Sequence, residues 1–74
     1  MEVEKMKAII EAILFSAGRV VKINELILVL EKNEEEIQNI IENMQEDYKK
    51  DNRGIEIIKN MKSEYINQYL FIYL

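Results

Sequence analysis

Residues 33–50, NEEEIQNIIENMQEDYKK, carry the clearest structural pattern in this chain of 74 residues. The apolar positions follow the spacing of one helix face, namely Ile37, Ile40, Ile41, Met44 and Tyr48. Asn33 followed three residues later by Glu36 is typical of a helix N-terminus, where the first side chain accepts a backbone N–H. Glutamates in the first turn and lysines in the last suit the helix dipole. The pattern predicts a helix from residue 34 to about residue 50.

A second helix face lies near the N-terminus. Its apolar positions are Met6, Ile9, Ile10, Ile13, Leu14 and Ala17. Gly18 follows where a left-handed residue commonly ends a helix. We therefore predict a helix from residue 4 to residue 17, and then a short β-branched segment around Val20 and Val21 that forms either a brief strand or a turn.

The segment between these two patterns predicts a further helix. Its apolar stripe consists of Ile23, Leu26, Ile27 and Leu30. Leu28 and Val29 add apolar surface outside the stripe, which is typical of a helix that is central in a core or shared with a partner. Asn24 is a plausible N-cap and Lys22 is the competing start. The helix is expected to end near Lys32.

Downstream, the residues from Asp51 to Gly54 predict a turn. Residues 55–60 predict a strand with Ile55 and Ile57 facing the core. Residues 61–64 are expected to form a loop and residues 65–74 a second β-like run. This order predicts a single domain over residues 1–74, of α+β class and mainly α. The architecture would be a winged helix-turn-helix, with three helices and a C-terminal β-hairpin as the wing. The predicted core comprises Ile9, Ile10, Ile13, Leu14, Leu26, Leu30, Ile37, Ile40, Ile41, Met44, Ile55 and Ile57.

The composition argues against catalysis, disulfide bonds and metal binding. The chain has no Cys and no His, which removes disulfides, thiolate chemistry, ordinary zinc sites and imidazole catalysis. Ser16 and Ser63 have no His to activate them, and the carboxylates are explained by solubility and helix capping. We therefore expect a protein that is not an enzyme and uses no metal or cofactor. No apolar run reaches the ~20 residues of a membrane helix, and the N-terminus does not resemble a signal peptide; we expect a cytoplasmic protein.

The location of the charge weighs against nucleic acid. The net charge is −4, and residues 33–50 contain six acidic and two basic side chains, so this segment alone has a charge of −4 while the other residues sum to zero. In a helix-turn-helix the second helix of the motif, here residues 34–50, enters the major groove. Since Lys and Arg supply much of the affinity for phosphates, we expect no direct nucleic-acid binding.

The final ten residues, 65–74, contain no charged side chain and four of the six aromatic residues. A wing strand of this composition at a sheet edge would be prone to aggregate. Three interpretations remain open. The segment could pair with a partner, it could pack over Ile58 and the helix of residues 34–50, or it could depart from the natural ending through truncation or a shifted reading frame.

Three stretches together resemble a bacterial family, segregation and condensation protein B. Residues 9–18, IIEAILFSAG, and residues 21–26, VKINEL, are similar to its opening helix and to the I-x-E-L motif that follows. Tyr48 and the stretch from Asn52 to Ile57, NRGIEI, resemble its Y-x-x-x-x-R-G-I-E segment. The resemblance covers residues 6–60. Tyr65 matches a family tyrosine, but residues 66–74 do not match the pattern.

The resemblance implies a role without catalysis. Family members contain two winged-helix domains, dimerise, and bind the kleisin subunit (ScpA) of the SMC complex, which condenses and segregates chromosomes and would place the protein at the nucleoid. This chain would be the N-terminal domain, which the family associates with self-association. The second domain, which carries much of the kleisin binding, would be absent.

These observations lead to the hypothesis of a small winged-helix interaction module that forms homodimers. Apolar residues in surplus over the core are the candidates for the self-association surface: Leu28, Val29, Tyr69, Phe71 and Tyr73. The alternative hypothesis is a DNA-binding winged-helix transcriptional regulator.

Overall fold

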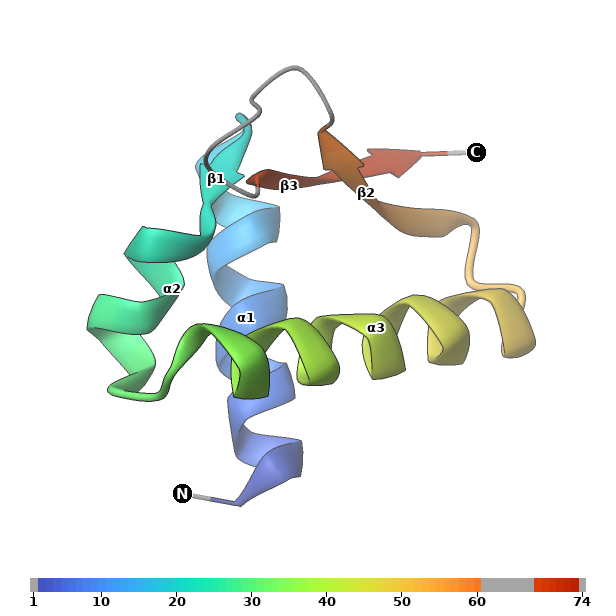
Figure 1. Ribbon diagram of the computed structural model, residues 1–74. Helices are drawn as coiled ribbons and strands as arrows, with labels where there is room; N and C mark the ends of the chain where they lie inside the picture. The colour runs from blue at the N-terminus through green and yellow to red at the C-terminus, as the bar shows by residue number, and fades with distance from the viewer. Residues whose placement is uncertain (1, 61–67, 74) are drawn as a thin grey trace.

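The computed structural model describes residues 2–60 and 68–73. Its elements are α1 (Val3–Ala17), β1 (Val21–Lys22), α2 (Ile23–Leu30), α3 (Glu34–Lys50), β2 (Ile55–Asn60) and β3 (Gln68–Tyr73). The sheet lies over α3, and α1 passes behind α3 (Figure 1). This arrangement confirms the predicted α+β, mainly helical, winged-helix architecture.

The predicted end of α1 is confirmed. Gly18 adopts the left-handed conformation, with a φ of 61°, directly after the last helical residue. The following segment is a brief strand rather than a turn, because Val21 and Lys22 pair with β3.

The structure decides between the two predicted starts of α2, Asn24 and Lys22. Asn24 as the N-cap is wrong; Lys22 occupies that position. The reason is Glu25, whose Oε2 accepts the backbone N–H of Lys22 at 2.9 Å. The helix ends at Leu30, before the expected Lys32, because Glu31 takes a left-handed conformation with a φ of 54°. Its N–H donates to the carbonyl of Ile27 at 2.9 Å.

The prediction for α3 is confirmed at both ends. The Asn33 side-chain oxygen accepts the backbone N–H of Glu36 at 2.9 Å, and its amide donates to the Glu36 carboxylate at 3.3 Å. After the helix, Asn52 and Gly54 have positive φ values of 53° and 76° and turn the chain into β2. A left-handed residue is least strained as glycine, which accounts for Gly54 at the second of these positions.

The sheet has the order β1-β3-β2, with both neighbours antiparallel to β3. Val21 pairs with Tyr69, and Ile57 pairs with Phe71. The expectation that the C-terminal strand lies at a sheet edge is therefore wrong for Gln68 and Tyr69, which pair with β1. The rest of β3, from Leu70 to Tyr73, pairs with β2. The described part of the tail packs within the chain, which favours the second of the three interpretations. The predicted loop, Tyr65 and Leu74 lie outside the described residues.

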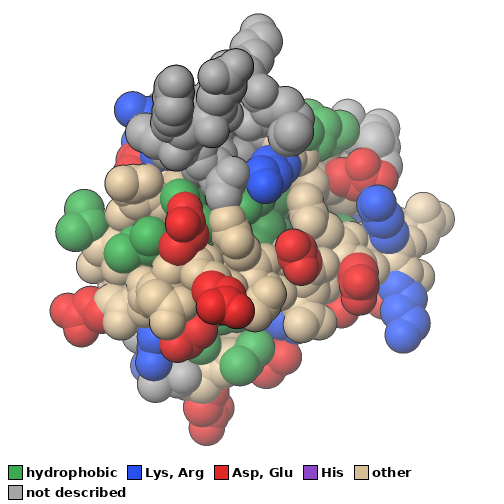
Figure 2. Space-filling model, in the orientation of Figure 1, with side chains coloured by type: hydrophobic (Ala, Val, Ile, Leu, Met, Phe, Trp, Pro, Cys, Tyr) green, Lys and Arg blue, Asp and Glu red, His purple; other side chains and the backbone are tan. Residues whose placement is uncertain are grey.

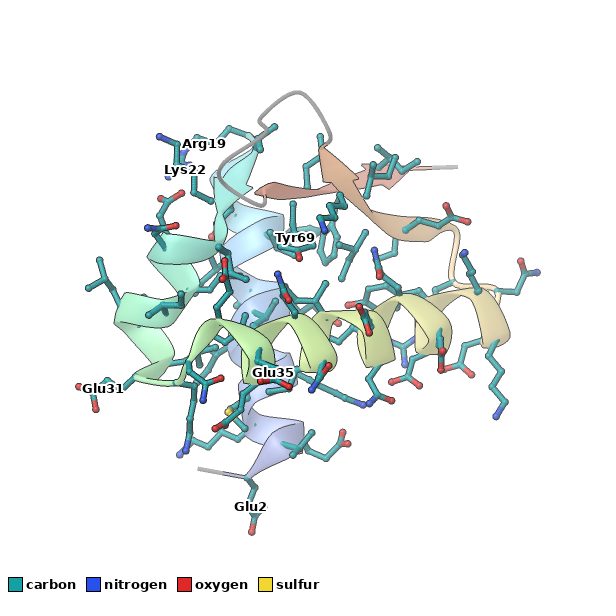
Figure 3. All side chains as sticks on the ribbon, in the orientation of Figure 1. Glu2, Arg19, Lys22, Glu31, Glu35 and Tyr69 are labelled. Carbon is teal, nitrogen blue, oxygen red and sulfur yellow. The ribbon has the colours of Figure 1, made fainter. Side chains whose placement is uncertain are left out.

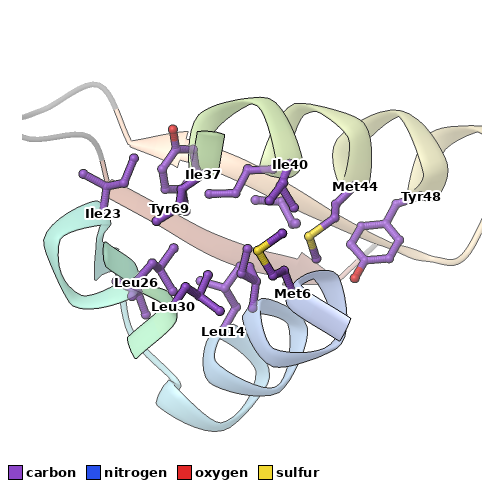
Figure 4. Packing of buried hydrophobic residues seen from close by; sticks show 14 residues of the cluster. Met6, Leu14, Ile23, Leu26, Leu30, Ile37, Ile40, Met44, Tyr48 and Tyr69 are labelled. Atoms are coloured by element: carbon purple, nitrogen blue, oxygen red, sulfur yellow. The ribbon is translucent and has the colours of Figure 1, made fainter. Parts of the chain in front are cut away.

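One hydrophobic core joins all three helices to the sheet (Figure 4). Its buried members are Met6, Ile10, Leu14, Val21, Ile23, Leu26, Leu30, Ile37, Ile40, Ile41, Met44, Tyr48, Ile57 and Tyr69. Three predicted core residues, Ile9, Ile13 and Ile55, are instead half-buried around this cluster. Tyr69 is the addition with the largest consequence, because it brings the C-terminal strand into the core.

Candidate functional site

A polar cluster fixes the end of α3 against α1. The Tyr48 hydroxyl donates a hydrogen bond to Glu11 Oε2. The Arg53 guanidinium lies 5.2 Å from the centre of the Tyr48 ring and 3.9 Å from Glu11. Burial, and next the Glu11 carboxylate, raise the pKa of the Tyr48 hydroxyl, so the tyrosine remains a neutral donor. The cluster holds the turn before β2 beside α1.

A second polar contact fixes the link between α1 and α2. The Arg19 guanidinium lies 2.7 Å from Glu25, whose carboxylate also accepts the Lys22 N–H. These two bonds, the one from Arg19 first, lower the pKa of Glu25 to about 2. Arg19 and Lys22 are labelled at this link in Figure 3. The pair closes the short link between α1 and α2. Because both side chains are substantially exposed, it contributes little to the free energy of unfolding.

The serine at the end of α1 makes a local contact. The Ser16 hydroxyl donates to the carbonyl of Ala12 at 2.8 Å, one helical turn back. The hydroxyl is therefore bonded to the backbone of its own helix.

The outer face of α3 is acidic. Its exposed members are Glu34, Glu35, Glu36, Glu42 and Glu46. Acidic side chains gather over this helix in Figure 2, and Glu35 points away from the core in Figure 3. A helix that would have to approach phosphates therefore presents negative charge to solvent.

The five residues predicted for self-association do not form one surface. Leu28 and Val29 are 79% and 56% exposed on α2. Tyr69 was expected on the surface, but it is 4% exposed and packs in the core, so this placement is wrong. Phe71 is half-buried with its ring edge-on to Tyr48, at 5.8 Å between centroids. Tyr73 pairs with Ile55 through its backbone, and its side chain lies outside the description.

Phe71 belongs to an apolar depression that the sequence reasoning did not identify, which we call the α1 groove. Its apolar lining comes from α1 and the sheet: Ala8, Ala12, Phe15, Ile55 and Phe71. Glu11 and Arg53 form its polar rim, and the volume is about 380 Å³. Phe15 projects beside it with 63% of its surface exposed. A second apolar stripe on α1 could have predicted this groove from the sequence. Ala8, Ala12 and Phe15 follow the i, i+4, i+7 spacing of one helix face.

Comparison with known proteins identifies the family. The sequence profile of the family described as "Segregation and condensation complex subunit ScpB" matches residues 8–69. This chain belongs to the segregation and condensation protein B family. The resemblance seen in the sequence is thereby confirmed, and the match extends past β2 into β3.

Relatives with the name segregation and condensation protein B occur in several bacteria. The one from Lachnoclostridium phytofermentans is 42% identical over 59 residues, covering 80% of this chain and 31% of the relative. That of Caldanaerobacter subterraneus is 49% identical over 49 residues, covering 66% and 29%. That of Bacillus subtilis is 35% identical over 71 residues, covering 95% and 34%. The chain spans about a third of the length of these relatives.

No solved structure gave a significant match. None of the described helices combines the length and apolar character that crossing a membrane requires.

Proposed function

We propose that this chain is a non-catalytic interaction module that acts in chromosome segregation and condensation. The observation that carries the proposal is the family match over residues 8–69. The module would act without a cofactor, by dimerising and by assembling with the kleisin subunit of the SMC complex. An acidic α3 and exposed apolar side chains on α1 and α2 support a protein partner rather than nucleic acid.

Dimerisation is supported by size and by exposed apolar surface. A domain of this length buries only about 60% of the surface that its unfolded chain exposes, so its stability is limited without a partner. Phe15, Leu28 and Val29 are large apolar side chains that are more than half exposed. Of the residues predicted for self-association, Phe71 lines the α1 groove, whereas Leu28 and Val29 lie on α2 outside it. Multi-angle light scattering is expected to give the mass of a dimer, and a stable monomer at micromolar concentration would contradict it.

Assembly with the kleisin rests on the family name of a complex subunit. The test is titration of the cognate kleisin into the 74-residue chain, followed by gel filtration. Co-elution is expected. Separate elution of the two proteins at micromolar concentrations would contradict assembly through this domain.

The second candidate is a DNA-binding winged-helix transcriptional regulator, which the helix-turn-helix arrangement of α2 and α3 favours. The acidic outer face of α3 opposes it, because the helix that would enter the groove carries the net negative charge. A mobility-shift titration at low salt decides between them. Binding that weakens steeply with salt would overturn the interaction-module proposal in favour of the regulator.

A further inference from the structure

The surface along α1 combines a protruding aromatic ring with depressions on both sides of it. Toward the C-terminal end of α1, a second depression is lined by Phe15, Gly18, Arg19 and Phe71, with Leu14 and Leu70. Phe15 and Phe71 line this depression as well as the α1 groove, so the Phe15 ring stands between the two. Phe71 is held in place from behind by its edge-on contact with Tyr48.

We infer that the α1 groove is where two copies of this chain meet, with their α1 helices antiparallel across a two-fold axis near Ala12. This inference rests on the proposed dimerisation and specifies the surface that forms it. In such a pairing Phe15 of each copy lies against Ala8 of the other, at the groove. A two-fold contact requires one surface to hold both the projection and the recess that receives it, and this face holds both.

The spacing along α1 fits this arrangement. Ala8 and Phe15 are two turns apart, about 10 Å along the axis, and Ala12 lies between them on the same stripe. Alanines at the centre of the stripe allow two helix backbones to approach closely, because their side chains end at Cβ. The Phe15 rings then lie away from the two-fold axis, where the depressions can receive them.

One pair of charges along α1 is complementary under the same pairing. The rotation that opposes Phe15 to Ala8 also brings Glu4 of one copy towards Arg19 of the other, at the two ends of the helix. Both side chains are largely exposed, 85% for Glu4 and 60% for Arg19, although within one chain Arg19 also pairs with Glu25 and Glu4 lies 3.7 Å from Lys7. Opposite charges at symmetry-related ends favour the antiparallel orientation and a second copy as the occupant.

A dimer of standard size would cover a modest share of the surface of the chain. A standard interface buries about 800 Å² on each partner, roughly 15% of the 5178 Å² that the chain exposes. Leu28 and Val29 on α2 are also exposed, but neither lines the depressions along α1. Leu28 is therefore a matched control, an exposed apolar residue placed outside the proposed contact.

The first test compares Phe15→Glu with Leu28→Glu in the 74-residue chain by sedimentation velocity, with circular dichroism to verify folding. The wild type and Leu28→Glu are expected to dimerise, and Phe15→Glu to weaken the dimer by roughly tenfold or more, as for a buried aromatic anchor. A dimer that survives Phe15→Glu would overturn this surface and leave the proposed function standing. Dissociation by both variants would also overturn it. A monomeric wild type would contradict the proposed dimerisation itself.

The second test does not depend on a disruptive substitution. The chain has no cysteine, so Ala12→Cys introduces one thiol per copy, close to the proposed axis. Mild oxidation is expected to give a covalent dimer, since a disulfide requires Cα atoms about 4.4–6.8 Å apart. Leu28→Cys is expected to remain unlinked under the same conditions. Cross-linking of Leu28→Cys, or none with Ala12→Cys in a dimeric protein, would overturn the inference.

Discussion

Helices α1 and α3 contribute to the same core but present opposite surfaces to solvent. α1 buries Met6, Ile10 and Leu14, and α3 buries five residues of its own stripe. Outside the core, α1 exposes an apolar stripe of Ala8, Ala12 and Phe15 beside its charged residues, whereas the exposed residues of α3 are polar or charged, with five glutamates among them. Packing requires the inner stripes to be alike. The outer stripes are free to differ, apart from the first turn of α3, where the helix dipole favours glutamates. The outer surfaces therefore carry the information about partners.

The largest expected effect tests whether the two inner stripes are equivalent. Ile10 on α1 and Ile41 on α3 are both 0% exposed. Ile10→Ala and Ile41→Ala should each lower the free energy of unfolding by about 2–5 kcal/mol, because each removes buried methyl groups and leaves a cavity. Urea denaturation followed by circular dichroism measures this. A loss below about 1 kcal/mol at either site would show that the two helices do not share one core.

The next effect concerns one of the polar bonds between the two helices, that of Tyr48 with Glu11. Tyr48→Phe removes the hydroxyl that donates to Glu11 and should lower the free energy of unfolding by about 1–2 kcal/mol. A double-mutant cycle with Glu11→Ala, which removes the acceptor, isolates the pair from the ring packing. If the two substitutions are additive, the hydroxyl–carboxylate bond does not stabilise the contact between α1 and α3.

The two helices also differ at their N-termini. Asn33 caps α3 through its side chain, whereas Glu2 at the start of α1 makes no such bond. Asn33→Ala should therefore cost about 1 kcal/mol, and Glu2→Ala less than about 0.5 kcal/mol. Thermal unfolding of both variants measures the contrast. Equal shifts in Tm would contradict the assignment of a functional cap to α3 alone.

The smallest effect lies beyond the C-terminus of α1, where Arg19 pairs with Glu25. The folded-state pKa of Glu25 is lowered from 4.5 to about 2. The wild type should therefore be more stable than Glu25→Gln above about pH 4.5. This advantage should shrink as the pH falls from about 4.5 towards 2, because in this range the unfolded chain binds a proton at Glu25 that the folded state does not yet bind. Its size should stay below about 1 kcal/mol, since both side chains are substantially exposed.

Unfolding curves at several pH values measure this dependence. Glu46→Gln, at an exposed site on α3, is the control and should follow the wild type. A pH-independent difference between the wild type and Glu25→Gln would contradict the lowered pKa.

The sequence predicted the local elements well because their signals are local. The stripe of α3, the Asn33 cap and the Gly18 terminus each depend on residues within a few positions of one another. The errors at α2 arose where two local signals competed. The bond from Lys22 to Glu25 started the helix before Asn24, and a left-handed Glu31 ended it early.

Periodicity, caps and turn residues determined the helices, the strand of residues 55–60 and the family, because each of these is encoded in short patterns. Only the tertiary structure decided that β3 lies between β1 and β2, that Tyr69 is buried, and that Phe15 stands beside a groove. The pairing of Val21 with Tyr69 joins residues far apart in the chain. No local pattern contains that contact, because it depends on how the helices place the two strands in space.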